Sequence, residues 1–334
     1  MKKAVASLAC VASIVLAVAI EAQQPAPPLW AFPVAPAAAG GGGARGAGAA
    51  GRGGAAAPDT GPKSVPGTTV TLTLAQTRDT YNVPDWHPDG HPAMPEIVGR
   101  GRRTTVFACG YCHPPNGQGR PENQSVAGLP AEYIVQQMAD FKNGLRKSSE
   151  SRLGPQNLMI NIAKAATDEE VRAAADYFSK LKLKPWIRVV ETATVPQTRI
   201  QGGMFLVVEG GMTEPIGNRI IEVPEDLERT ELRDDASGFI AYAPVGSIKK
   251  GEALAGGGGG KTTACNVCHG PDLRGLGPVP SIAGRSPSQM ARQMWDMQHG
   301  ARNGPWTQLM KPVVSKLSEE DLVSVSAYLA SLKP

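Results

Sequence analysis

Two short stretches of the chain, CGYCH at 109–113 and CNVCH at 265–269, each carry two thiols with an imidazole directly after the second. Thiols at this spacing can form a redox dithiol, supply half of a zinc site, or add to the two vinyl groups of one haem. These three kinds of site need different surroundings. The elements around each stretch therefore decide between them.

Both stretches belong to an internal repeat. CGYCH is followed by SVAGLPAEYIVQQMADFKNGLR and LMINIAKAATDEEVRAAADYFSKLK, whereas CNVCH is followed by SIAGRSPSQMARQMWDMQHGAR and LMKPVVSKLSEEDLVSVSAYLASLK. The closing blocks align without a gap at an offset of 151 residues. The repeat predicts two similar domains, at 95–183 and 246–334.

Each repeat has a helical pattern. In the first, Ile134, Met138 and Phe141 fall on one face of a helix. The second has apolar residues at matching spacing, namely Met290, Met294 and Met297. The closing helices begin with TDEE and SEED, a hydroxyl cap followed by acidic residues that the helix dipole favours. We therefore expect a mainly α fold.

The other segments differ in composition. Residues 1–22 join two lysines to an apolar run and predict a cleaved secretory signal peptide, with a retained membrane anchor as the alternative. Residues 23–66, rich in Ala, Gly and Pro, predict a disordered tether, and 67–94 predict an extended lead-in. Residues 184–245 hold β-prone runs such as WIRVV and GFIAY, which predict a small β-rich insertion between the repeats.

These surroundings favour one of the three readings of CxxCH. A redox dithiol normally lies in a βαβ unit, which the helical flanks lack. The halves of a four-cysteine zinc site are usually ~15–20 residues apart, but about 150 residues separate the two pairs here. C-x-x-C-H is the signature of covalent haem attachment, with the histidine directly under the iron. We therefore predict two covalently bound haem c groups.

The two repeats resemble class I cytochrome c domains, and their tandem arrangement is similar to diheme cytochromes c of the c-four type. The resemblance rests on CxxCH, the AG-turn-helix block, the methionine before the closing helix and the aromatic residue in that helix. It covers 95–183 and 246–334. It implies thioether bonds and proximal iron ligands at matching positions, the thioethers at Cys109, Cys112, Cys265 and Cys268 and the ligands at His113 and His269.

A distal ligand must approach the opposite haem face, so we expect it on a loop well downstream. Met159 and Met310 lie 46 and 41 residues after their histidines and eight residues before the closing helix caps. The resembled family has its distal methionine at this place. Met138 and Met294 also align, but they lie at core spacing in amphipathic helices, where methionine commonly fills gaps. We predict that Met159 and Met310 bind the two irons.

Three further residues carry smaller expectations. His87 and His91 have the i, i+4 spacing of a helical metal site, but the proline after each one forbids a regular helix. A metal role is therefore not favoured. Pro280 occupies the position whose carbonyl orients the proximal histidine in the resembled family. The first repeat has Gln124 there, a departure that leaves its equivalent contact in question.

With His/Met ligation, neither iron has an open site for substrate, and the expected chemistry is reversible one-electron transfer. We predict an exported, periplasmic carrier, alone or as the cytochrome subunit of a respiratory or dehydrogenase complex. Its partners would be electron donor and acceptor proteins of the cell envelope, with any membrane association through partners or an uncleaved signal. The alternative is a diheme peroxidase or sulfur-compound oxidoreductase with one labile ligand. The net charge of +4 is scattered and does not support nucleic-acid binding.

Overall fold

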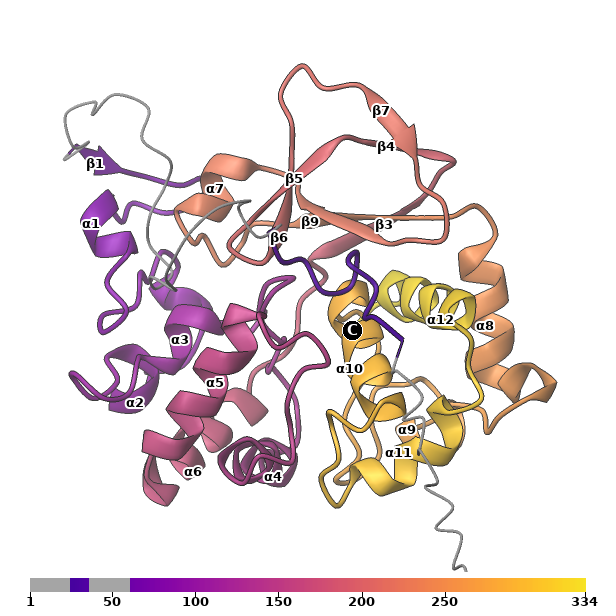
Figure 1. The fold of residues 1–334 in the computed structure, drawn as a ribbon. Coiled ribbons are helices and arrows are strands. Elements are labelled where there is room, and N and C mark those ends of the chain that lie inside the picture. The colour runs from indigo at the N-terminus through magenta and orange to yellow at the C-terminus, as the bar shows by residue number, and fades with distance from the viewer. Residues whose placement is uncertain (1–24, 36–60) are drawn as a thin grey trace, which may run out of the picture.

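The computed structural model describes residues 25–35 and 61–334 (Figure 1). The predicted signal peptide at 1–22 lies outside these residues, as does most of the predicted tether. The described part is mainly helical, as predicted, with small sheets. Within it, no helix is long and apolar enough to cross a membrane. Figure 1 shows two groups of helices side by side, with most of the strands along one edge of both.

The first group of helices belongs to the first repeat. Its elements are α2 (Glu96–Gly99), α3 (Cys109–Cys112), α4 (Ala131–Lys142), α5 (Gly154–Ala165) and α6 (Asp168–Ser179). Helix α6 begins at the expected hydroxyl, because Thr167 and Glu170 form a capping box that satisfies backbone donors of the first turn. Its apolar face, including Tyr177 and Phe178, is buried against α2 and α4.

The second group belongs to the second repeat. Its elements are α8 (Ser247–Gly257), α9 (Asn266–His269), α10 (Pro287–Gln298), α11 (Thr307–Val314) and α12 (Glu319–Ser331). A capping box of Ser318 and Asp321 starts α12. Helices α8 and α12 cross so closely at Gly251 that a Cβ there would clash with the carbonyl oxygen of Ser324.

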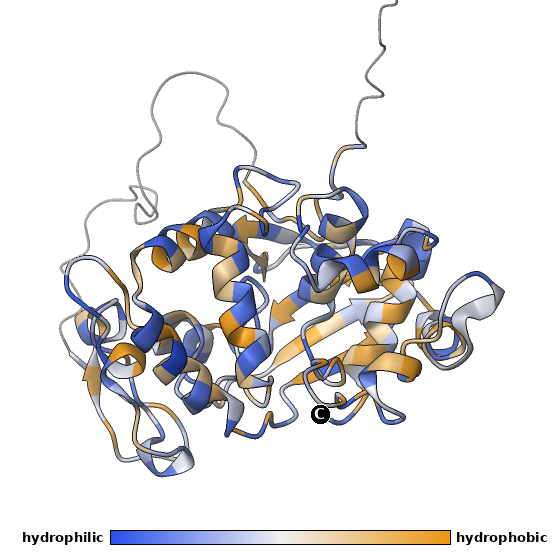
Figure 2. Ribbon diagram, turned by 90° about the horizontal axis from the view of Figure 1, so that it is seen from below, coloured by the Kyte–Doolittle hydropathy of each residue, from blue (hydrophilic) through white to orange (hydrophobic). Residues whose placement is uncertain are grey.

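Most of the strands lie in the segment predicted to be β-rich, and a two-stranded sheet lies where the predicted tether joins the lead-in. The lead-in has β2 (Leu72–Thr73) and α1 (Leu74–Thr77), whereas β1 (Pro62–Lys63), which pairs with β2, lies in the last residues of the predicted tether and corrects the prediction of disorder there. The later strands are β3 (Ile187–Glu191), β4 (Thr194–Pro196), β5 (Thr198–Gln201), β6 (Met204–Val207), β7 (Thr213–Pro215), β8 (Ile221–Pro224) and β9 (Phe239–Ala243), with α7 (Leu227–Glu231) before β9. The central sheet has the order β3-β9-β8, with β3 parallel and β8 antiparallel to β9. It packs on α10 and α12, and Figure 2 shows its apolar strands among the helices.

The segment 25–35 corrects the predicted tether. Trp30, Ala31 and Phe32 are buried in the core formed with β8, β9, α10 and α12, and Phe32 has 0% exposure. Trp30 Nε1 donates to Glu319 Oε1 at 3.0 Å, and the Ala31 carbonyl accepts from Arg292 at 2.9 Å. The prediction of disorder is wrong for this segment because it followed the average composition of 23–66. Two large aromatic side chains offset the entropy lost in ordering so short a stretch.

Candidate haem sites

The first CxxCH stretch faces a mainly apolar pocket that is open to solvent on one side. Cys109 and Cys112 form the ends of the short helix α3, and His113 follows as its C-cap residue. These three residues line the pocket together with Met138 of α4 and Met159 of α5. Two thiols, an imidazole and two thioethers are thus brought to one cavity.

The imidazole of His113 is held in one orientation. Its Nδ1–H donates to the backbone carbonyl of Gln124 at 2.7 Å, which leaves Nε2 free to bind a metal. Burial lowers the pKa of His113, opposed by this hydrogen bond and reinforced by the nearby Arg146 charge, so the ring stays neutral. The question raised by Gln124 is thereby answered. The contact uses a backbone oxygen, which any residue at that position supplies.

The second stretch has the same local geometry. Cys265 directly precedes α9, whereas Cys268 and His269 lie within it. His269 is 7% exposed, and its Nδ1–H donates to the carbonyl of Pro280 at 2.8 Å. Burial lowers its pKa as well. The carbonyl lies eleven residues after the histidine in both repeats, so a single backbone arrangement orients both rings.

The thiols are not poised for redox chemistry. Cys109 and Cys265 are free thiols whose pKa values burial raises to about 12 and about 11. A reactive dithiol needs the opposite shift, toward a thiolate at neutral pH. These surroundings argue against a redox dithiol. They suit thiols that stay protonated until they form thioether bonds.

The two predicted distal ligands lie on helices, not on loops as expected. Met159 is in α5 and Met310 in α11, and both are half-buried. Proline at an N-terminal position of α5 favours helix initiation there. Met294 packs against the cores around α10 and α12, whereas Met138 shares the first pocket with Met159. The choice of Met159 over Met138 therefore stays a prediction.

One wall of the first pocket comes from the second repeat. Gln289, Arg292 and Gln293 of α10 line the same cavity as His113. No local pattern predicts this contact, because it depends on how the two repeats pack. A signal was nevertheless present, since Arg146 and Arg302 occupy equivalent positions in the two repeats.

These two arginines meet where the repeats touch. Arg146 Nη2 donates to Gln293 Oε1 at 2.9 Å, and Arg302 Nη2 donates to Tyr133 Oη and Gln137 Oε1, both at 2.9 Å. Burial, together with the neighbouring Arg302, lowers the pKa of Arg146 to about 9. Within the described residues, the buried Nε of each arginine has no hydrogen-bond partner. Arg146 also lines the first pocket, and a spare cationic donor there fits a flat apolar group with an anionic edge, as haem has with its propionates.

Arg302→Ala is expected to lower the free energy of unfolding by about 1–3 kcal/mol, because Tyr133 and Gln137 would lose a buried donor. Denaturant unfolding of the haem-loaded protein measures this cost. Arg274→Ala, at a half-exposed side chain of the same repeat, is the control and should change stability by less than ~0.5 kcal/mol. Equal effects of the two substitutions would contradict a role for Arg302 in joining the repeats.

Each of the two helical repeats holds a CxxCH stretch whose histidine is oriented and neutral. Together they form the scaffold of a haem protein. Residues 252–329 match the family model described as "Cytochrome C oxidase, cbb3-type, subunit III". Cytochrome c4 of Azotobacter vinelandii is 26% identical over 247 residues, which cover 72% of this chain and 91% of that protein. The thiosulfate dehydrogenase electron acceptor of Thiomonas intermedia is 25% identical, over 67% of this chain and 78% of its own length.

Cytochrome c-554(548) of Halomonas halodenitrificans is 35% identical over 82 residues, which make up 24% of this chain and 96% of that protein. The chain belongs to the cytochrome c family, and over about 70% of its length it is similar to cytochrome c4 proteins. Membership implies covalently bound haem c with its iron.

Proposed function

We propose that this chain is an exported, periplasmic carrier of single electrons with two haems. Its cytochrome c domains are 95–183 and 246–334, joined by the β-rich insertion at 184–245. Cys109 and Cys112 anchor the first haem, and Cys265 and Cys268 anchor the second. The axial ligand pairs are His113 with Met159 and His269 with Met310. When bound, each haem supplies an iron that changes between the ferrous and ferric states.

The histidines of this chain prepare the proximal side. Because each Nδ1–H is donated to a backbone carbonyl, the free lone pair is on Nε2, the orientation of the ring is fixed and Nε2 is made more basic. The low pKa of both rings keeps protons from competing for that lone pair at neutral pH. This arrangement of a neutral imidazole beside two thiols is the observation that carries the proposal.

The pocket walls exclude water. The first cavity is lined by apolar side chains from α2, α4, α5 and α6 and from the loops between helices, and the nearly fully buried ones include Val106 and Leu129 of the loops and Phe178 of α6. A dry environment reduces the solvent rearrangement that accompanies a change of charge. The residues thus favour electron transfer over substrate chemistry, which needs an open coordination position.

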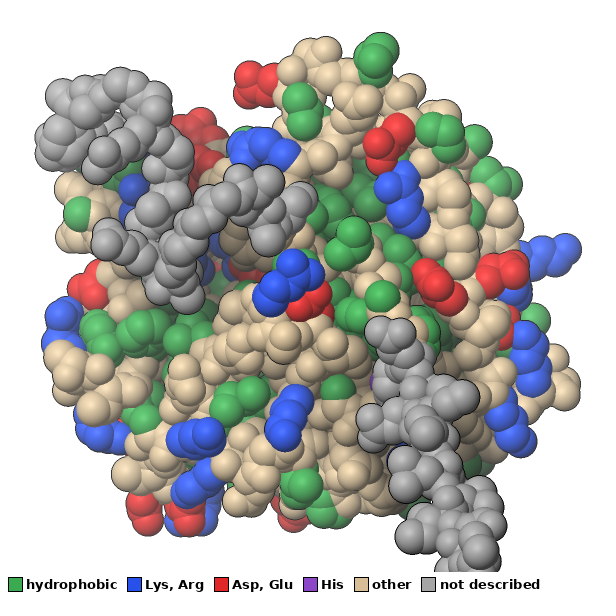
Figure 3. All heavy atoms as spheres, viewed as in Figure 1, with side chains coloured by type: hydrophobic (Ala, Val, Ile, Leu, Met, Phe, Trp, Pro, Cys, Tyr) green, Lys and Arg blue, Asp and Glu red, His purple; other side chains and the backbone are tan. Residues whose placement is uncertain are grey.

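Electron donor and acceptor proteins of the cell envelope are the proposed partners, including a dehydrogenase of which this chain could be the cytochrome subunit. The name of the Thiomonas intermedia relative, an electron acceptor of thiosulfate dehydrogenase, supports this class of partner. Val267, Leu276 and Leu309, close in sequence to the second haem ligands, are 65%, 59% and 76% exposed and could contact such a partner briefly. Figure 3 shows basic and acidic side chains intermixed on one face, with no continuous basic surface for nucleic acid in the described part of that face.

The test is a near-infrared magnetic circular dichroism spectrum of the oxidised holoprotein, combined with a haem count per chain. We expect two haem c groups and methionine-to-iron charge-transfer intensity for two Met-ligated irons. One high-spin or differently ligated iron would overturn the carrier and favour a diheme enzyme. A single haem per chain would overturn the assignment of one CxxCH stretch.

A further inference from the structure

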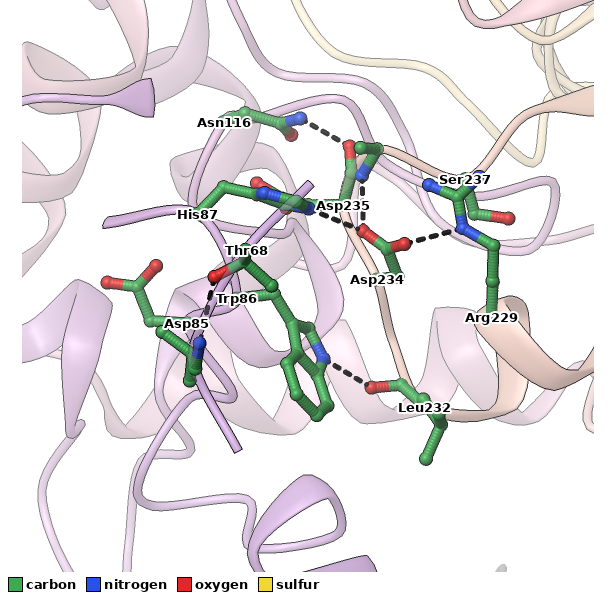
Figure 4. A network of polar contacts seen from close by, with 12 residues as sticks. Thr68, Asp85, Trp86, His87, Asn116, Arg229, Leu232, Asp234, Asp235 and Ser237 are labelled. Atoms are coloured by element: carbon green, nitrogen blue, oxygen red, sulfur yellow. Dashed lines mark hydrogen bonds and ion pairs between the residues drawn. The ribbon is translucent and has the colours of Figure 1, made fainter. Parts of the chain in front are cut away.

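A second cluster of possible ligands lies outside the haem pocket, where the lead-in meets the loop after α7 (Figure 4). His87 Nε2 is 2.9 Å from Asp234 Oδ1 and 3.8 Å from Asp235 Oδ1. One ligand atom from each residue lies within 4.8 Å of the other two. His87 and Asp234 are 147 residues apart in the sequence, so only the fold brings them together.

Asp235 is the most informative member of this cluster. Its side chain is 4% exposed, and its Oδ1 accepts no hydrogen bond from any residue that the structure describes. Asp234, by contrast, accepts from His87, from the backbone N–H of Ala236 at 2.9 Å and from Arg229 Nε at 2.7 Å. A buried carboxylate oxygen without a donor is costly. It would be satisfied by a cation beside His87.

We propose that His87, Asp234 and Asp235 bind a divalent transition-metal ion, with Zn²⁺ as the best match. One imidazole nitrogen and two carboxylate oxygens are ligands that Zn²⁺ accepts, whereas Ca²⁺ and Mg²⁺ prefer oxygen alone. Metal–ligand distances of ~2.0–2.2 Å in a tetrahedron place the ligand atoms ~3.4 Å apart. The observed 2.9 and 3.8 Å require shifts of only ~0.5 Å to reach that value. The His87 side chain is 20% exposed and leaves a path for entry and for a solvent ligand.

The surrounding structure holds both parts of the site in place. Trp86, next to His87, is 0% exposed, and its Nε1 donates to the carbonyl of Leu232 at 2.8 Å, close to Asp234 in the chain (Figure 4). Val65 completes this small core. The ligands are therefore brought together by packing that does not depend on the ion.

An ion here would act close to the first haem motif. Arg233, directly before the two aspartates, donates to the Tyr111 carbonyl at 2.8 Å, and its guanidinium lies 3.7 Å from the centre of the Tyr111 ring. Asn116 Nδ2 donates to the Asp235 carbonyl. The metal would thus tie the lead-in to a loop that contacts CGYCH, and would stabilise the surroundings of the first haem.

His91 provides a matched control. It follows His87 by four residues, but its Nε2 lies 3.1 Å from Asp85 Oδ1 and its Nδ1 lies 3.1 Å from Tyr177 Oη. The metal-ligand cluster does not include it. The i, i+4 pair of histidines is therefore not the site. The two aspartates that join His87 come from the C-terminal part of the insertion 184–245.

The experiment titrates the chelator-treated, haem-loaded protein with Zn²⁺ by calorimetry and follows its thermal midpoint. We expect one Zn²⁺ per chain and a higher midpoint with the ion. Asp235→Asn should weaken binding at least ~100-fold, beyond the ~10–100-fold typical of outer-sphere changes, and should abolish the midpoint shift. His91→Gln should leave the affinity and the midpoint shift close to the wild-type values, because His91 bonds to Asp85 and Tyr177 and is not one of the ligands of the cluster.

The thermal midpoint measured in chelator distinguishes the loss of a metal ligand from the loss of a structural contact. In chelator, Asp235→Asn should unfold at or above the wild-type midpoint, because the lost oxygen accepts no hydrogen bond in the described structure. His87→Gln, which keeps a donor toward Asp234, provides a second ligand variant. Absence of stoichiometric Zn²⁺ binding, or unchanged affinity in both ligand variants, would overturn the proposal. Equal binding of Ca²⁺ would overturn its preference for a transition metal.

Discussion

Met159→Leu is expected to remove the charge-transfer band of one haem and to lower the reduction potential of that haem by on the order of 0.1–0.3 V. A methionine ligand favours the ferrous state, and axial ligands together tune haem potentials over ~0.8 V. Leucine has a similar volume, so the packing of α5 should change little. Redox titration followed by optical and magnetic circular dichroism spectra measures both effects.

Met138→Leu is the matched control, because Met138 lines the same pocket from α4. This substitution should keep both bands and shift the potential far less. Loss of the band in Met138→Leu, with Met159→Leu unaffected, would place the distal ligand on α4 and refute the assignment. The pair of variants therefore decides a question that sequence spacing and pocket geometry leave open.

Phe32→Ala is expected to lower the free energy of unfolding by about 3–5 kcal/mol. Phe32 is fully buried in the core that joins the central sheet to α10 and α12, and alanine would leave a cavity there. Denaturant unfolding of the haem-loaded protein measures the loss. The effect is large for a residue in a segment that composition alone marks as disordered.

Leu29→Ala is the control for this prediction. Leu29 lies three residues earlier and is 62% exposed, so its truncation should cost less than ~0.5 kcal/mol. If both substitutions had the same small effect, the segment would not contribute to the core. A large loss confined to Phe32→Ala would establish the N-terminal segment as part of the folded unit.

Local features of the sequence predict much of this molecule. The CxxCH stretches, the helical repeats and the capping residues Thr167 and Ser318 depend on neighbours along the chain, and the structure has the corresponding helices. The contact from Gln124 to His113 is harder to foresee because it uses a backbone carbonyl, whose position depends on the chain path and not on the side chain. The position of Met159 in a helix, and not on a loop, likewise depends on the path of the chain.

Contacts between distant segments account for the rest. Trp30 and Phe32 are two apolar residues in a long Ala, Gly and Pro background, so their burial depends on a surface formed by later elements. The meeting of His87 with Asp234 and Asp235 likewise requires the folded insertion. No periodicity along the chain encodes either contact.

The wall that α10 contributes to the first pocket also bears on the order of assembly. Gln289, Arg292 and Gln293 are synthesised long after CGYCH, because a protein chain is made from its N-terminus. Until they arrive, Cys109 and Cys112 stand in a pocket with one side missing. The enzyme that joins haem to these thiols would therefore meet an open cleft, which the last part of the chain then closes.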